Sequence, residues 1–475
     1  MNSKNNSANN QMKPNILFLI IDSLRADKVS GPDKNSITPT LDFVKENGVL
    51  FDHTISSADG TILSYAGLFS GKHPFKTGMR NSKLTRLCDT TSYLEILKKN
   101  GYNLYGCVPE TTTLLEIIPE FENNFEAEMD YPNILTDAGK FVLNKLETGM
   151  KEPWFFLVHV LNMHFPVTKP KGFESEKYGN NNYEKQISAI DVWLSKVLKK
   201  VDLKNTLVII TADHGAYIQS LKRDSLEIDF QDKGEMQMKI SKVARLANPW
   251  RNSVTAKSVE PKSLESLKMK MFLAREKFNR NKKLKKIKDL NLKPHEIRGL
   301  LSQRSNPERF LFDEKIRVPL FMIGHKVNQK KTISQQIRLI DVFPTICDMI
   351  GITGERNVDG ISVYPLLQGK KIEDVAAYIE STPAIQIKTD DVIGIRTNRY
   401  KYFRSRYDPK KHIHFYDLKN DPYEDENLAD KSKETCAKME GILKNIINGF
   451  SLEKVCYEDN NDKKVENVLK KLGYV

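Results

Sequence analysis

The chain has 475 residues, of which 39% are hydrophobic and 28% charged, so it can bury a large core and hold more than one folding unit. Its five cysteines are scattered without CxxC or another metal-ligand spacing, and they favour a reducing compartment. The net charge of +13 belongs almost entirely to residues 222–309, which contain 23 Lys and Arg against 11 Asp and Glu.

The N-terminal residues 1–13 are polar and rich in Asn, which predicts a disordered tail. The first apolar run, Asn15 to Ile21, is too short for a signal peptide or a membrane span. We therefore expect a cytoplasmic protein without an export signal or a transmembrane segment.

That first run, NILFLII, is continuously apolar and ends at Asp22, which is typical of a strand buried on both faces of a parallel sheet. Ligands of open α/β sheets bind at the carboxyl ends of the strands, so Asp22 is a candidate metal ligand. A turn or helix-capping role for Asp22 remains an alternative.

Thr61 lies in the stretch from Ala58 to Gly71, ADGTILSYAGLFSG, which predicts a helix that starts near this threonine. The first amides of a helix are unpaired and its dipole is positive there, so anions collect near such a hydroxyl. Capping the helix is the simpler role for Thr61.

Strands and helices continue to alternate, which indicates an α/β fold with a parallel sheet. The apolar strand Trp154 to Val160 leads to His164, and an amphipathic helix over 183–201 follows. A further strand, Leu207 to Ile210, then brings Asp213 and His214 to the same sheet edge as Asp22; the alternative is an Asp-His-Gly turn.

These side chains together suggest a metal site. Two carboxylates, an imidazole and a hydroxyl form a hard donor set with oxygen and nitrogen for a divalent cation. Such a cation would lower the pKa of the Thr61 hydroxyl and neutralise an anionic ester, which would prepare Thr61 for nucleophilic attack.

Ten sequence blocks in order resemble the sulfatase branch of the alkaline phosphatase superfamily, from Pro14 to about Asp430. They include NILFLIIDSLRAD, TPTLDFVKENGVLF, TILSYAGLFSGKHPFKTG, NTLVIITADHG and HFYDLKNDPYEDENLAD. The resemblance implies an alkaline-phosphatase-like three-layer α/β sandwich with a mostly parallel central sheet. It places a catalytic domain at 14–350, with a basic helical insertion or lid at 222–309.

Short strand-like runs after Gly351, such as IGIRT and KYFRSR, predict a small antiparallel sheet. We assign it to a C-terminal subdomain, 351–450, which completes the fold. Residues 451–475 are expected to form a charged tail.

Carried over to this chain, the resemblance implies Asp22, Asp213 and His214 as ligands of one divalent ion, which is Ca, Mn or Zn. It implies Thr61 as the nucleophile, also touching the metal. His164, in the block Asn162-Met163-His164, is expected to contact the anionic group of the substrate. His159, inside an apolar strand, is interpreted as structural and left out of the site.

The chain also departs from the family pattern. True sulfatases carry Cys or Ser at the nucleophile position within Cys/Ser-x-Pro-x-Arg, and the corresponding residues here are Thr61, Leu63 and Tyr65. Formylglycine cannot form on this pattern. Ser23 stands where the family often has a second Asp.

Two further positions differ. Arg25 and Asp27 follow the DxxRxD variant of bacterial and archaeal relatives. The expected catalytic Lys or His is absent near residues 307–309, and Arg309 is interpreted as a surface side chain.

We therefore predict a metal-dependent sulfatase-family hydrolase that attacks a sulfate or phosphate ester through Thr61. One alternative is a phospho-group transferase or phosphodiesterase with a phosphothreonine intermediate. The other is a catalytically degenerate protein that binds an anionic glycan.

The expected partner is an anionic ester substrate, with a glycan or a lipid as possible carriers. The basic segment could form a lid, an amphipathic helix on an anionic surface, or a patch for a polyanion; the surface contact would run through 262–288. No nucleic-acid-binding module is visible, so no specific nucleic acid is expected.

Overall fold

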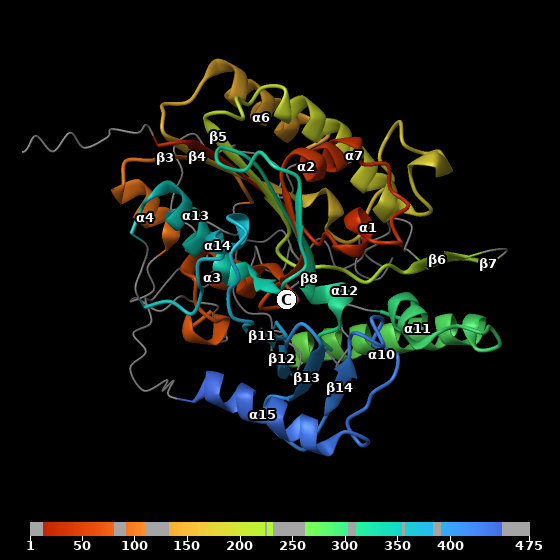
Figure 1. Cartoon of the computed structure of the whole chain (residues 1–475). Coiled ribbons are helices and arrows are strands. Elements are labelled where there is room, and N and C mark those ends of the chain that lie inside the picture. Colours follow the sequence, from red (N-terminus) through yellow and green to blue (C-terminus); the bar gives the residue numbers. More distant parts are fainter. Residues whose placement is uncertain are drawn as a thin grey trace, which may run out of the picture.

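The computed structural model describes residues 13–79, 92–109, 133–223, 226–230, 262–302, 310–353, 357–382 and 391–448. Within these ranges the chain forms a large central sheet, a smaller antiparallel sheet and a two-stranded hairpin (Figure 1). The predicted tails, 1–13 and 451–475, lie outside the described residues apart from Lys13. None of the described helices is long and apolar enough to cross a membrane.

The central sheet has the strand order β10-β2-β8-β5-β1-β4-β3, and β9 also pairs with β2. Only β8 runs antiparallel to its described neighbours, β2 and β5. The strands are β1 (Asn15–Ile21), β2 (Val49–Ile55), β3 (Asn103–Cys107), β4 (Trp154–Val160), β5 (Thr206–Thr211), β8 (Arg317–Gly324), β9 (Lys331–Ile333) and β10 (Ile337–Arg338). The mostly parallel sheet predicted from the sequence is therefore confirmed.

Helices cover both faces of this sheet, so the domain has three layers (Figure 1). On one face lie α2 (Pro39–Asn47), α6 (Asp137–Thr148) and α7 (Asn182–Leu198). On the other lie α3 (Thr61–Ser70), α4 (Tyr93–Lys99), α13 (Val342–Ile350) and α14 (Tyr364–Leu367).

The apolar strand β1 explains why both faces are covered. All seven of its residues are buried, so its side chains need an apolar partner on each side of the sheet. The Phe18 ring stacks on Phe343 of α13, with ring centroids 5.3 Å apart. Ile190 and Leu194 of α7 belong to the same continuous core.

The smaller sheet, with the order β11-β12-β13-β14, is entirely antiparallel, as the sequence predicts. One face packs against α15 through Ile395, Tyr402 and Leu443. Phe403 on the opposite face packs toward the central domain. The elements are β11 (Ala377–Glu380), β12 (Val392–Arg396), β13 (Tyr400–Ser405), β14 (His414–Asp417) and α15 (Lys433–Ile447).

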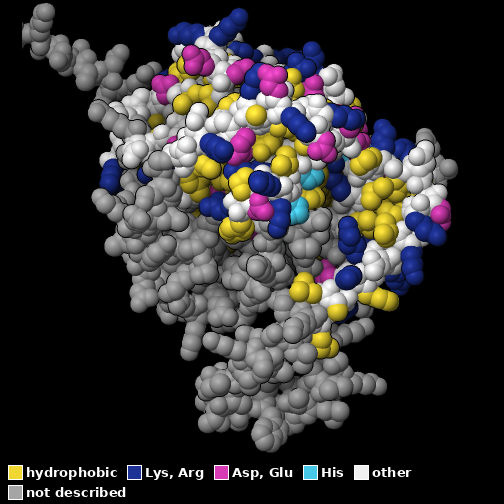
Figure 2. Space-filling view, turned by 90° about the horizontal axis from the view of Figure 1, so that it is seen from below, with side chains coloured by type: hydrophobic (Ala, Val, Ile, Leu, Met, Phe, Trp, Pro, Cys, Tyr) yellow, Lys and Arg dark blue, Asp and Glu magenta, His cyan; other side chains and the backbone are white. Residues whose placement is uncertain are grey.

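Within the basic segment, helix α10 (Lys262–Ile287) is followed by α11 (Pro294–Leu300). Ile287 and Leu300 pack against the hairpin of β6 (Ser220–Arg223) and β7 (Leu226–Asp229). Met271 and Phe278 of α10 are exposed among basic side chains. On the face of the molecule in Figure 2, Lys and Arg side chains lie among Asp and Glu side chains.

The remaining elements are single turns of helix between the larger ones. They are α1 (Asp27–Ser30), α12 (Asp313–Ile316), and the 3-10 helices η1 (Pro74–Lys76), η2 (Leu161–Met163), η3 (Glu176–Tyr178) and η4 (Leu339–Asp341). Of these, α1 follows the end of β1 and η2 follows β4, so both lie beside the carboxyl edge of the sheet.

Candidate active site

Three elements bring the predicted site residues together at the carboxyl edge of the central sheet. Strands β1 and β5 are parallel neighbours that pair Ile20 with Thr211, so Asp22 and Asp213 follow side by side. Helix α3 begins at Thr61 and presents its first turn to them. The two aspartates are almost completely buried, and Thr61 is 9% exposed.

The Thr61 hydroxyl lies between the two carboxylates and an imidazole. Its Oγ1 donates to Asp213 Oδ2 at 2.6 Å and lies 3.4 Å from Asp22 Oδ2. Nε2 of His214 is 3.3 Å from Thr61 Oγ1. The sequence prediction that these four side chains meet agrees with the structure.

The backbone fixes the orientation of His214. Its Nδ1 lies 2.8 Å from the carbonyl oxygen of Gly215, which can only accept a hydrogen bond, so Nδ1 carries the proton and Nε2 presents a lone pair. The His214 amide also donates to Asp213 Oδ1 at 2.8 Å. The imidazole therefore faces Thr61 as a base or a metal ligand.

Ser23, which stands at the position of the missing acidic residue, ties the two carboxylates together. Its amide donates to Asp213 Oδ1 at 3.1 Å and its hydroxyl to Asp22 Oδ1 at 2.6 Å. Its φ of 60° lies in the left-handed region, which costs a residue with a side chain free energy. The backbone is strained where it positions both aspartates.

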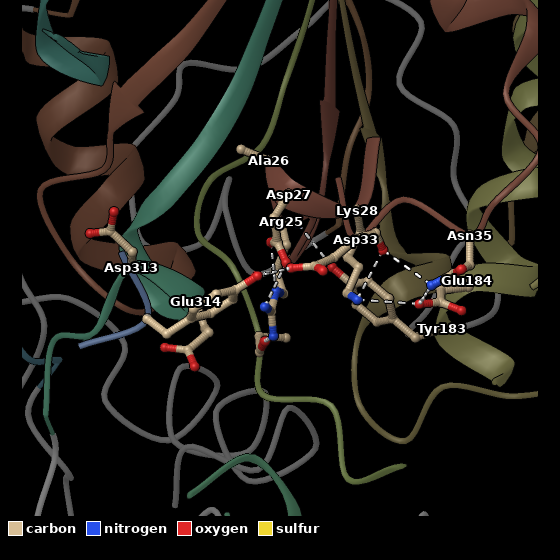
Figure 3. A network of polar contacts seen from close by, with 12 residues as sticks. Arg25, Ala26, Asp27, Lys28, Asp33, Asn35, Tyr183, Glu184, Asp313 and Glu314 are labelled. Atoms are coloured by element: carbon tan, nitrogen blue, oxygen red, sulfur yellow. Dashed lines mark hydrogen bonds and ion pairs between the residues drawn. The ribbon is translucent and has the colours of Figure 1, made fainter. Parts of the chain in front are cut away.

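Tyr183 of α7 supports this strained turn through two hydrogen bonds. Its hydroxyl donates to the Ser23 carbonyl at 2.7 Å. The same hydroxyl accepts from the amide of Arg25 at 2.9 Å, and Figure 3 shows Tyr183 beside Arg25. Burial raises the pKa of the Tyr183 phenol, so it stays protonated and can donate. Tyr183 belongs to no motif, and no pattern in the sequence indicates this role.

The Arg25 guanidinium is occupied by Asp27, through two N–H groups at 2.9 and 2.7 Å (Figure 3). Burial opposes ionisation of Asp27, but Arg25 lowers the pKa of that carboxyl to about 2. Because Arg25 and Asp27 are only two residues apart and bind each other, their ion pair stabilises the segment after Asp22. Arg309 lies outside the described residues.

His159, interpreted from the sequence as structural, lies beside the candidate site. It is the penultimate residue of β4, and its Nε2 lies 3.6 Å from Asp22 Oδ2. Asp22, His159 and Asp213 form the one group of three potential metal ligands found among the described residues, with donor atoms within 4.8 Å of one another. The place of His159 at the end of a strand was the signal that could have identified it.

His164 ends η2, directly after β4, and is partly exposed. Burial raises the pKa of the Asp22 carboxyl, but the imidazoles of His159, His164 and His214, in their protonated forms, lower it well below its usual value. Asn162 has a local role instead, because its side chain oxygen accepts from the Ile134 amide at 2.9 Å.

The smaller sheet also reaches the site. Beyond the end of β11, the Thr382 amide donates to Asp59 Oδ1 at 2.7 Å, two residues before Thr61. A Cβ at Gly60 would lie 2.7 Å from Thr382 Oγ1, so this close approach requires glycine. The C-terminal sheet thus supports the loop that starts α3, which the sequence blocks did not indicate.

A divalent cation fits this arrangement. Asp22 and Asp213 are buried beside each other, and carboxylates in such a position need a cation to balance their charges. Both ring nitrogens of His159 are buried and have no hydrogen-bond partner within the described structure. Carboxylate oxygens with imidazole nitrogens are suitable donors for a divalent metal.

Comparison with known proteins identifies the class. The family model described as Sulfatase matches residues 14–352, and that described as N-sulphoglucosamine sulphohydrolase, C-terminal, matches 304–449. Arylsulfatase K of Gallus gallus is 20% identical over 92% of this chain and 83% of its own length. Delta 4,5-hexuronate-2-O-sulfatase of Bacteroides thetaiotaomicron is 31% identical over 28% of this chain and 29% of its own length.

Among solved structures, the phosphonate monoester hydrolase of Agrobacterium radiobacter aligns with a TM-score of 0.61 at 14% identity, covering 91% of this chain and 95% of that one. This likeness confirms the alkaline-phosphatase-like fold. The chain belongs to the sulfatase family, and it is a sulfatase-like hydrolase of sulfuric or phosphoric esters.

Proposed function

We propose that this hydrolase is metal-dependent and that Thr61 is its nucleophile. The observation that carries the proposal is the position of the Thr61 hydroxyl, at the start of α3 and 2.6 Å from Asp213 Oδ2. A side chain that only capped the helix would accept from a backbone amide of the first turn. In α3 the N-cap residue is Gly60, and the Thr61 hydroxyl instead donates to the Asp213 carboxylate.

Asp22, Thr61, Asp213 and His214 would hold the metal ion. When bound, a divalent cation lowers the pKa of the nucleophilic hydroxyl and neutralises the anionic ester. Asp213 Oδ2 is the nearest acceptor for the Thr61 proton, and the Nε2 lone pair of His214 is left for the metal ion. The positive end of α3 and His164 would bind the anionic group of the substrate.

The choice between sulfate and phosphate depends on how the covalent intermediate is released. A phosphothreonine is cleaved by attack of water or an alcohol at phosphorus, whereas sulfothreonine lacks the elimination route of formylglycine. Leu63 and Tyr65 replace the residues needed to form formylglycine. Phosphate ester or phosphodiester hydrolysis, or phospho-group transfer, is therefore the second candidate, supported by the phosphonate hydrolase of the same fold.

For the carrier of the ester we propose an anionic glycan, because a relative is named for a hexuronate 2-O-sulfate. Contact of helix α10 with an anionic surface is a separate proposal, supported by its exposed basic residues beside Met271 and Phe278. Both proposals leave the chemistry at Thr61 unchanged.

The test compares purified wild type with Thr61→Ala, Thr61→Ser and the control Thr345→Ala, which removes another buried hydroxyl outside the site. Each is assayed with aryl sulfate, phosphate monoester and phosphodiester in Mn²⁺, Zn²⁺ or Ca²⁺. Thr61→Ala should lose turnover by roughly a thousandfold or more, while Thr61→Ser and Thr345→Ala keep measurable activity.

Mass spectrometry of the quenched reaction should show phosphate or sulfate attached to the peptide that contains Thr61. Turnover by Thr61→Ala at the wild-type rate would disprove the nucleophile. Absence of turnover with every ester and metal would instead favour a degenerate protein that binds an anionic glycan.

A further inference from the structure

We propose that His159 is an additional ligand of the metal ion, and that its imidazole makes the site prefer a transition-metal ion such as Zn²⁺ or Mn²⁺ over Ca²⁺. The inference depends on the proposed function only in that the site holds a cation. It does not depend on which residue attacks the substrate.

Three side chains lie close enough to share one ion. The donor atoms of Asp22, His159 and Asp213 lie within 4.8 Å of one another, and Nε2 of His159 is 3.6 Å from Asp22 Oδ2. Ligands bound at about 2.0–2.2 Å on opposite sides of one ion are separated by about 4 Å. A single ion therefore reaches all three residues with small adjustments.

The His159 imidazole is buried without a satisfied ring nitrogen. His159 is 1% exposed, and neither of its ring nitrogens makes a full hydrogen bond among the described residues, because the nearest acceptor, Asp22 Oδ2, lies 3.6 Å from Nε2. The Tyr65 ring packs beside it, with centroids 5.2 Å apart. Burying an unpaired polar group costs free energy, so a residue chosen only for packing would be apolar. A metal ion would satisfy one of the nitrogens.

Position 23, next to Asp22, holds a serine and no carboxylate. Ser23 donates its hydroxyl to Asp22 Oδ1 and so supplies no negative charge. His159 approaches the other oxygen, Oδ2, of the same carboxylate. The donor set therefore has two carboxylates, two imidazoles and one hydroxyl, whereas a third carboxylate would make it richer in oxygen.

This change in donor type decides the expected metal. Ca²⁺ takes six to eight oxygen ligands and has little affinity for nitrogen. Imidazole is a good ligand for Zn²⁺ and other transition ions, and their affinity rises with the number of nitrogen donors. Two buried imidazoles on the same carboxylate pair thus favour a transition ion.

The test measures metal binding to the full-length protein without any substrate. Metal-free wild type, His159→Gln and His159→Glu are titrated calorimetrically with Zn²⁺, Mn²⁺ and Ca²⁺, and metal content after dialysis is determined by mass spectrometry. The matched control is His73→Gln, because His73 is also buried with an unpaired ring nitrogen but lies outside the cluster.

Wild type and His73→Gln should bind Zn²⁺ or Mn²⁺ more tightly than Ca²⁺ by about tenfold or more. His159→Gln should weaken Zn²⁺ binding about tenfold or more, and His159→Glu should shift the preference toward Ca²⁺. The absorption spectrum of the Co²⁺-loaded protein should also change in His159→Gln, because a nitrogen ligand is lost.

The inference is overturned if wild type prefers Ca²⁺ or binds no ion, or if His159→Gln keeps wild-type Zn²⁺ affinity and Co²⁺ spectrum. Circular dichroism of the metal-free variants confirms folding, and the result for His159→Glu decides the matter if His159→Gln does not fold. Retained turnover in Thr61→Ala would refute the nucleophile but would leave these binding results standing.

Discussion

The hydroxyl of Thr61 and the carboxylate of Asp213 form a buried hydrogen bond of 2.6 Å between the first turn of α3 and the end of β5. The same carboxylate lies beside Asp22, so one residue both accepts the hydrogen bond of the threonine hydroxyl and contributes to the concentrated negative charge. We therefore expect the Asp213 carboxylate to favour activity and, in the metal-free protein, to lower stability.

We predict that Asp213→Asn lowers turnover by roughly a hundredfold or more, because the nearest acceptor for the Thr61 proton is lost. The same substitution should raise the melting temperature of the metal-free protein, since it removes one of two adjacent buried negative charges. Steady-state kinetics and thermal unfolding in a chelator measure the two effects. A variant with normal turnover, or one less stable without metal, would contradict this account.

Tyr183→Phe should reduce both stability and activity. The substitution leaves the Ser23 carbonyl and the Arg25 amide without their partner, which costs roughly 2 kcal/mol of unfolding free energy. It also removes a hydrogen bond that supports the strained turn at Ser23, and this turn positions Asp22. Tyr102→Phe is the control, because its buried hydroxyl donates to the Pro14 carbonyl elsewhere in the fold.

Denaturant unfolding should show a loss of stability in both of these variants, while kcat falls only in Tyr183→Phe. An equal loss of kcat in Tyr102→Phe would show that the effect reflects general destabilisation.

Metal removal should lower the melting temperature of the wild type. An ion present at 100 times its dissociation constant stabilises the folded state by about 2.7 kcal/mol, and a chelator abolishes this gain. Asp22→Asn weakens the site, so its melting temperature should respond much less to added metal. A thermal-shift titration measures both, and an unchanged metal response in Asp22→Asn would exclude that carboxylate as a ligand.

Acid should destabilise the protein in part through His414 in the smaller sheet. Burial, and the neighbouring His412, lower the pKa of His414 from 6.5 to about 4. Its ring stacks on Phe403 and its Nδ1 lies 2.8 Å from the Tyr416 hydroxyl. Because the folded state favours the neutral imidazole, its contribution to stability is present above pH 6.5 and is lost as the pH falls toward 4.

The loss amounts to about 3 kcal/mol at most across that interval. His414→Phe should therefore show a smaller decrease in unfolding free energy than the wild type between pH 7 and pH 5. His73, whose pKa is also lowered to about 4 by burial, titrates in both proteins and provides the common background. Parallel stability curves for the two proteins would rule out the contribution of His414.

The sequence alone determined the elements and most of the site. Continuous apolar runs predicted β1, β4 and β5, because strands buried on both faces leave no polar face. The same reasoning placed Asp22 and Asp213 at strand ends, where parallel neighbours must bring them to one edge. The sequence blocks, in their order along the chain, then predicted the fold and the places of Thr61 and His214 in the candidate site.

Only the tertiary structure decided what surrounds these residues. His159 looked structural because an apolar strand hides the direction of each side chain, and only pairing with β1 shows that it faces Asp22. Tyr183 and Thr382 reach the site from segments more than a hundred residues away from the residues they support, through backbone hydrogen bonds that have no sequence pattern. Local patterns specify which elements form, but the contacts between distant segments depend on packing in three dimensions.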